Sequence, residues 1–145
     1  MSYIKEIVRV KQEFLISSNE RFKVTSTDSA IEFATSIIGD EAREIVFLII
    51  MDAKNHVNCY QKIFIGDATK STCSVREILK AVLLANGTRF ILAHNHPSQD
   101  LTPSKSDIQT TKKLKTASEQ VGLNFLDHLI VSATEGVSLL QLELF

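Results

Sequence analysis

The apolar residues of this chain fall into short runs separated by polar turns, and these runs predict alternating strands and helices. Residues 45–51 are apolar at every position, which favours a central strand covered on both faces. A turn at residues 52–55 leads into an antiparallel return strand that completes a hairpin. The mixed pattern near the start of the chain predicts an edge strand followed by a polar turn at residues 17–20. The strands predicted besides 45–51 are residues 3–16, 56–66, 89–93, 123–132 and 137–142.

Three further stretches repeat their apolar residues at helical spacing. Asp28 is the expected N-cap of the first helix, and Gly39 ends it. The second helix follows a polar connection at residues 67–74 and stops at Asn86-Gly87, while the third covers residues 104–121. The expected apolar faces are Ile31, Phe33, Ala34, Ile37 and Ile38 in the first helix, Ile78, Leu79, Val82 and Leu83 in the second, and Ile108, Thr111, Leu114, Ala117 and Val121 in the third.

Composition bounds the class of protein. A length of 145 residues suits a single domain spanning residues 1–145, and no repeat or linker suggests a second one. The 16 basic and 17 acidic side chains give a net charge of −1, which argues against a protein whose main work is coating nucleic-acid phosphates. Two cysteines, Cys59 and Cys73, are expected to be reduced packing residues. Without a signal peptide or an apolar run of about 18 residues, we expect a cytoplasmic protein with no membrane span.

The stretch from His94 to Asp107 is too polar to be explained by packing. Successive strand side chains point to opposite faces, so His94 and His96 point the same way, with Cβ atoms about 7 Å apart. Two such imidazoles can converge on one metal. A catalytic zinc ion usually has three protein ligands, and Asp107 is the candidate for the third. The proline-containing loop at 97–103 can fold back and place the start of the third helix over the strand end.

A simpler interpretation exists for part of this stretch. Ser104 and Asp107 have the spacing of a capping box, with Asp in place of the usual Glu or Gln. They could therefore serve only to start the third helix. The two interpretations are compatible, because Ser104 can cap the helix while Asp107 turns its carboxylate to a metal.

The joint pattern resembles a known family. His94-x-His96, seven residues and then Ser104-x-x-Asp107 match the metal-binding signature of the JAMM (MPN+) metalloproteases. The surrounding segments are similar to the RadC-type JAB domain over residues 25–142. These segments are Arg43-Glu44, Arg76-Glu77-Ile78, Ile91-Leu92-Ala93-His94-Asn95-His96-Pro97-Ser98 and Leu126-Asp127-His128. The resemblance implies an α/β fold of JAB/MPN type, with a mixed, largely antiparallel sheet flanked by helices in a three-layer, cytidine-deaminase-like architecture. The helix-hairpin-helix region of longer members is not expected here.

The resemblance also implies a chemistry. Zn²⁺ would be held by His94, His96 and Asp107, and the zinc would lower the pKa of water toward ~7. Glu44 matches the family glutamate that takes a proton from this water and passes it to the leaving amine. Ser104 matches the serine that helps to hold the oxyanion. The implied substrate is a peptide or a protein.

Three further polar residues are candidates for a supporting role. Asn95 points to the opposite face of its strand from the two histidines, so it is expected to support the site rather than to bind the metal. Asp127 and His128 resemble a pair typical of the RadC branch, and one of them is expected at or next to the site. Ordinary hydrogen bonding within a strand would explain both of them equally well.

Two function classes stay open at this point. The first is a zinc-dependent hydrolase of an amide or isopeptide bond, which the intact ligand set and Glu44 favour. The second is a binding module associated with DNA repair or mobile elements, with a non-catalytic zinc. Lysines on the third helix bear on the second class, although no aromatic residues among them suggest base stacking; they are Lys105, Lys112, Lys113 and Lys115. A nucleobase deaminase is excluded, because His-x-Glu and Pro-Cys-x-x-Cys are absent.

Overall fold

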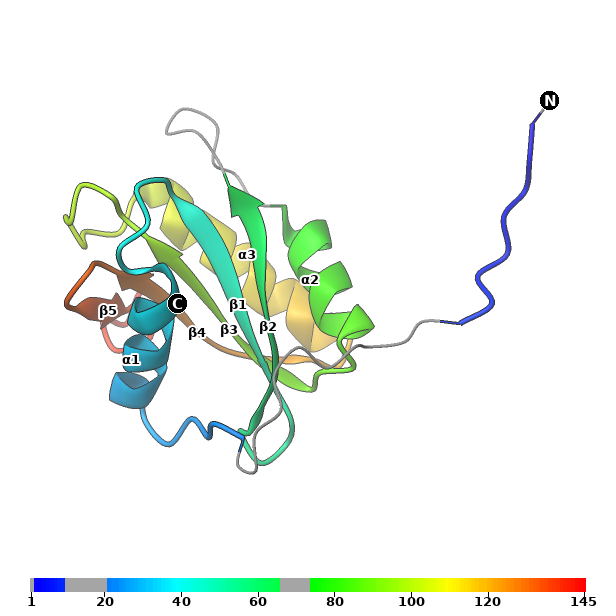
Figure 1. Ribbon diagram of the computed structural model, residues 1–145, viewed down its shortest axis with the longest axis horizontal. Coiled ribbons are helices and arrows are strands. Elements are labelled where there is room, and N and C mark those ends of the chain that lie inside the picture. Colours follow the sequence, from blue (N-terminus) through cyan, green and yellow to red (C-terminus); the bar gives the residue numbers. More distant parts are fainter. Residues whose placement is uncertain (1, 10–20, 66–73) are drawn as a thin grey trace.

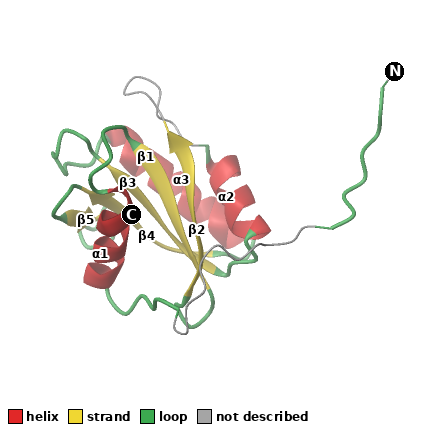
Figure 2. Ribbon diagram, viewed as in Figure 1, coloured by secondary structure: helices red, strands yellow, loops and turns green. Residues whose placement is uncertain are grey.

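The computed structural model describes residues 2–9, 21–65 and 74–145 of the chain. Within this part, one sheet of five strands is combined with three helices (Figures 1 and 2). The strands are β1 (Ile45–Met51), β2 (Val57–Ile65), β3 (Arg89–Asn95), β4 (Asn124–Val131) and β5 (Gly136–Ser138). The helices are α1 (Thr27–Ile38), α2 (Val75–Leu84) and α3 (Lys105–Gln120).

The sheet has the strand order β2-β1-β3-β4-β5. The β3–β4 pair is parallel, whereas the pairs β1–β2, β1–β3 and β4–β5 are antiparallel. Helix α1 covers one face of the sheet, and α2 and α3 cover the other (Figure 1). The predicted single α/β domain with a mixed, largely antiparallel sheet between helices is therefore confirmed.

Strand β1 is central to both layers of the core. All seven of its side chains are buried, as its uninterrupted apolar run predicted. Its odd-numbered residues, such as Phe47, pack with α1, and its even-numbered residues, such as Leu48, pack with α2 and α3. At about 25 cal/mol per Å² of apolar surface, the burial of this strand on both faces is a major contribution to stability.

The parallel pairing of β3 with β4 determines where α3 must lie. Two parallel strands need a crossover connection, and α3 forms that crossover. Because a strand and its following helix are joined by the short loop at 96–104, the N-terminus of α3 lies close to the C-terminal end of β3. The polar stretch of the sequence is thereby brought to one edge of the core.

Some predictions for the first part of the chain were wrong. Residues 3–9 form no strand, and Tyr3, Ile4, Ile7 and Val8 are exposed. The rest of that predicted strand, the turn at 17–20 and the connection at 67–73 lie outside the described residues. Helix α1 is capped by Ser26 rather than Asp28, because the Ser26 and Ser29 side chains each bond the other's backbone N–H. Asp28 instead lies in the first turn, where the helix dipole stabilises a negative charge.

Two predicted apolar faces extend less far than helical spacing suggested. Leu83 is 54% exposed and Val121 is 49% exposed. Leu83 lies beside the buried face of α2, which is formed by Ile78, Ala81 and Val82, and Val121 follows the last residue of α3. Strand β5 is also shorter than predicted. Residues 139–142 form turns closed by the bond from Leu142 N–H to the Ser138 carbonyl, so they do not continue the sheet. No described helix is long and apolar enough to cross a membrane.

The end of α1 makes a close approach to the end of β4 at Gly39. A Cβ added there would lie 2.5 Å from the carbonyl oxygen of Ser132, although the backbone of Gly39 is right-handed, with φ −62°. We therefore expect Gly39→Ala to lower the free energy of unfolding by roughly 2 kcal/mol through overpacking.

The matched control is Gly122→Ala. Gly122 has φ +75° and open space around its Cα. Alanine there should lower the free energy of unfolding only by the strain of its left-handed backbone, about 1 kcal/mol. Urea denaturation of both variants measures the difference. A Gly39→Ala protein as stable as Gly122→Ala would contradict the close-packing explanation.

Candidate metal centre

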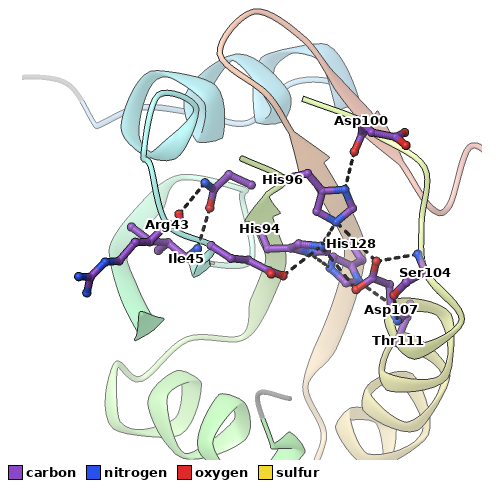
Figure 3. A network of polar contacts seen from close by, with 11 residues as sticks. Arg43, Ile45, His94, His96, Asp100, Ser104, Asp107, Thr111 and His128 are labelled. Carbon is purple, nitrogen blue, oxygen red and sulfur yellow. Dashed lines mark hydrogen bonds and ion pairs between the residues drawn. The ribbon is translucent and has the colours of Figure 1, made fainter. Parts of the chain in front are cut away.

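Two imidazoles face each other at the C-terminal end of β3. His94 Nε2 and His96 Nε2 are 2.8 Å apart (Figure 3), so the predicted convergence of His94 and His96 is confirmed. A carboxylate oxygen of Glu44, the residue before β1, completes a group of three ligand atoms that all lie within 4.8 Å of one another. Two ring nitrogens at this separation repel each other unless a proton or a cation lies between them. The donor set of imidazole nitrogen and carboxylate oxygen is one that zinc binds.

Asp107 faces the same pair of histidines from the start of α3. Its Oδ1 lies 3.5 Å from His94 Nε2, and its Oδ2 lies 3.7 Å from His96 Nε2. The loop at 97–103 therefore folds back over the strand end as predicted. Partial burial alone would raise the pKa of the Asp107 carboxyl, but the neighbouring imidazoles of His94 and His96 hold that pKa well below its usual range.

Ser104 is the N-cap of α3, and the capping box predicted from the sequence is present. The Ser104 Oγ accepts a hydrogen bond from Asp107 N–H at 3.0 Å, and Asp107 Oδ2 accepts one from Ser104 N–H at 2.8 Å. The capping box and the approach of Asp107 to the histidines coexist, so the two interpretations of this segment are indeed compatible. The capping bonds also restrict the rotamer of Asp107, which orients its carboxylate toward β3.

Asn95 supports the segment that carries Glu44. Its side chain is buried and, because Asn95 lies between His94 and His96 in the strand sequence, points to the opposite side of the strand from them. The Oδ1 accepts a hydrogen bond from Ile45 N–H at 2.7 Å, while the Nδ2 donates to the carbonyls of Arg43 at 2.8 Å and Glu41 at 3.2 Å. Both donors and the acceptor of the amide are thereby used on residues 41–45. The position of Glu44 beside His94 depends on this contact.

The two residues of the Asp127-His128 pair have different surroundings. His128 Nε2 lies 2.8 Å from His94 Nδ1, and His128 Nδ1 lies 2.6 Å from Thr111 Oγ1. Burial lowers the pKa of His128 to about 3. Asp127 lies on the opposite face of β4 and accepts hydrogen bonds from Ser138 Oγ, at 2.5 Å, and from Leu140 N–H. Burial raises the pKa of Asp127. Of the two residues, only His128 contacts the candidate site.

The loop after β3 fixes the ring of His96. Its Nδ1 lies 2.6 Å from the carbonyl oxygen of Asp100. A carbonyl can only accept, so Nδ1 carries the proton, and in the neutral ring the lone pair of Nε2 faces His94. In the absence of a cation, hydrogen bonding to the Asp107 carboxylate raises the pKa of His96. Gln99, whose backbone is left-handed at φ +66°, connects this loop to the segment after β4, because its Oε1 accepts a hydrogen bond from Ala133 N–H.

Three residues that contact the site residues were missed in the sequence. Thr111 was predicted only as part of an apolar helix face, and Asp100 and Gln99 were not singled out. Thr111 is one turn after Asp107, on the same face of α3, so a polar residue in a buried helix position was the signal available for it. Asp100 contributes a backbone atom, which no side-chain pattern can reveal.

Known proteins share long stretches of this sequence. A family model described as "RadC-like JAB domain" matches residues 24–144. A UPF0758 protein of Coprothermobacter proteolyticus is 36% identical over 141 residues, which cover 94% of this chain and 60% of the relative. A UPF0758 protein of Staphylococcus haemolyticus is 36% identical over 123 residues, covering 85% of this chain and 54% of the relative.

The match reaches other bacteria as well. A UPF0758 protein of Actinobacillus pleuropneumoniae is 42% identical over 91 residues, which cover 63% of this chain and 41% of the relative. The chain thus spans only about 60% or less of the length of these three relatives. The match over residues 24–144 includes every residue of the candidate metal centre, and the chain belongs to the RadC-like JAB domain family.

Proposed function

We propose that this domain is a zinc-dependent hydrolase that cleaves an amide or isopeptide bond in a peptide or protein. The observation that carries the proposal is the convergence of His94 Nε2, His96 Nε2 and two carboxylates at the end of β3. The JAB superfamily to which the chain belongs includes metalloproteases, which supports the same chemistry. The proposal concerns this domain, because the relatives are longer than the chain.

Both carboxylates are near enough to compete for the third ligand position. Asp107 approaches both histidines and has its rotamer restricted by the capping box. Glu44 approaches His94 at 3.9 Å and lies more exposed, with 23% of its side chain accessible against 17% for Asp107. A restrained carboxylate suits a ligand, and a more accessible one suits proton transfer. We therefore assign His94, His96 and Asp107 as ligands and Glu44 as the base.

Zinc bound at these residues would act as a Lewis acid and make water a nucleophile at neutral pH. The Glu44 carboxylate would accept a proton from the water that attacks the scissile carbonyl carbon, and would deliver it to the amine nitrogen as the carbon–nitrogen bond breaks. Ser104 has a second task besides capping. Its Oγ accepts the bond from Asp107 N–H, so its own hydrogen remains to be donated to the oxyanion that forms from the scissile carbonyl.

Metal analysis tests the ligand assignment. Purified protein should contain about one zinc ion per chain, and His94→Ala and Asp107→Ala should lose it, because each removes one of three protein ligands. His56→Ala is the matched control, since His56 follows the turn at the opposite end of β1. Stoichiometric zinc in both His94→Ala and Asp107→Ala would contradict the assignment.

Glu44→Gln tests the base. This variant keeps its shape and should keep its zinc, while hydrolysis should fall by roughly 10²- to 10⁴-fold, because an amide cannot accept the proton. Cleavage can be followed with a library of internally quenched peptides, and the same variant can serve as a trap for bound substrates. Loss of zinc from Glu44→Gln would instead identify Glu44 as a ligand. Zinc-loaded wild-type protein that cleaves nothing, yet binds DNA in a salt-sensitive way, would favour a binding module with a non-catalytic metal.

A further inference from the structure

A chain of side chains links two of the assigned metal ligands beneath the site. It starts at His94 Nδ1, passes through the ring of His128 to Thr111 Oγ1, and ends at the backbone carbonyl of Asp107 (Figure 3). The three separations are 2.8, 2.6 and 2.7 Å. His128 and Thr111 are buried, and neither points its polar atoms at the metal position.

The direction of every hydrogen bond in this chain follows from the group at its end, the backbone carbonyl of Asp107. The carbonyl of Asp107 can only accept, so the single hydroxyl hydrogen of Thr111 is donated to it. Thr111 Oγ1 must then accept from His128, which places a proton on His128 Nδ1. In a neutral buried ring, His128 Nε2 is left with a lone pair. That lone pair must accept from His94, so the proton of His94 is on Nδ1.

The consequence for His94 is a fixed tautomer. With the proton held on Nδ1, the lone pair of Nε2 points toward His96 and Asp107. A metal ligand needs this lone pair, and orienting partners of ligand histidines typically affect metal affinity strongly. His96 reaches the same state through the backbone of Asp100, which no substitution removes. For His94 the tautomer depends on the side chains of His128 and Thr111, so substitutions can test it.

We propose that Thr111 and His128 are positioning residues that hold His94 in the metal-binding tautomer and join its strand to the helix turn that carries Asp107. The inference rests on the proposed function only in taking the centre to bind a metal. Thr111 is central to it, because its one hydroxyl satisfies the Asp107 carbonyl and determines the tautomer of both histidines. The polar atoms of their side chains are used on His94, on each other and on the Asp107 carbonyl, so they act through these two residues.

Thr111→Val removes the hydroxyl with little change in shape, and Thr111→Ser keeps it. Ser118→Ala is the matched control, because Ser118 is also buried on α3 and donates to a carbonyl four residues earlier, that of Leu114 at 2.6 Å. Zinc affinity would be measured on metal-free protein by competition with a chromophoric chelator. We expect Thr111→Val to bind zinc roughly 10- to 100-fold more weakly, and Thr111→Ser and Ser118→Ala to bind as wild type does.

Two further measurements separate positioning from general damage to the fold. The Co²⁺ absorption spectrum should change in Thr111→Val and not in Ser118→Ala, and thermal melting of the metal-free variants reports any loss of stability. Wild-type affinity and spectrum in Thr111→Val would overturn the proposal. Should Thr111→Val fail to fold, long-range ¹H–¹⁵N spectra of metal-free wild-type protein still decide it, because His94 and His128 should both carry their proton on Nδ1. A proton on His94 Nε2 would overturn it.

None of these measurements depends on turnover, so all of them can be made with Glu44 unchanged. A protein that binds zinc and cleaves nothing would contradict the proposed hydrolase and leave the role of Thr111 intact. Unchanged zinc affinity in Thr111→Val would contradict the role of Thr111 and leave the proposed hydrolase intact.

Discussion

The position of β3 between an antiparallel and a parallel neighbour is the constraint on which the site depends. The antiparallel pairing places the start of β1 beside the end of β3, with Val46 opposite His94. The parallel pairing places the end of β4 there as well, with Ile130 opposite His94. It also requires a crossover helix whose N-terminus comes back to the same edge. Four segments of the chain therefore bring polar residues to one place.

Buried polar groups hold these segments in register. The side-chain amide of Asn95 makes all its hydrogen bonds to residues 41–45. Asp127 joins β4 to Ser138 in β5 and to Leu140 in the turn after it. Each of the two side chains is buried and hydrogen-bonded. Removing one partner from such a pair costs the desolvation of the group left behind, about 1–3 kcal/mol or more if it is charged. The network therefore restrains geometry in addition to contributing stability.

Local features of the chain predicted most of the elements. The uninterrupted apolar run of β1 indicated a strand covered on both faces, and the alternation of strand side chains put His94 and His96 on one side. The capping box at Ser104 and Asp107 marked the start of α3. Each of these depends on residues within one or two turns or pleats, so the sequence pattern contains the information. The errors at residues 3–9, Leu83 and Val121 share one cause, which is that an apolar residue there has no neighbouring element to bury it.

The sequence by itself determined the elements, the chemical character of residues 94–107 and, through its resemblance to the RadC-type JAB domain, the identity of Glu44 as their distant partner. Only the tertiary structure decided which groups meet. Asn95 reaches residues 41–45, some fifty positions away, and Thr111 joins His128 to the carbonyl of Asp107. Helical spacing placed Thr111 on a buried face but could not distinguish packing from hydrogen bonding, because that depends on what another strand presents to it. The physical reason is that a hydrogen bond forms between groups that are close in space. Which strands are neighbours depends on the order and direction of their pairing, and the local sequence pattern does not determine that.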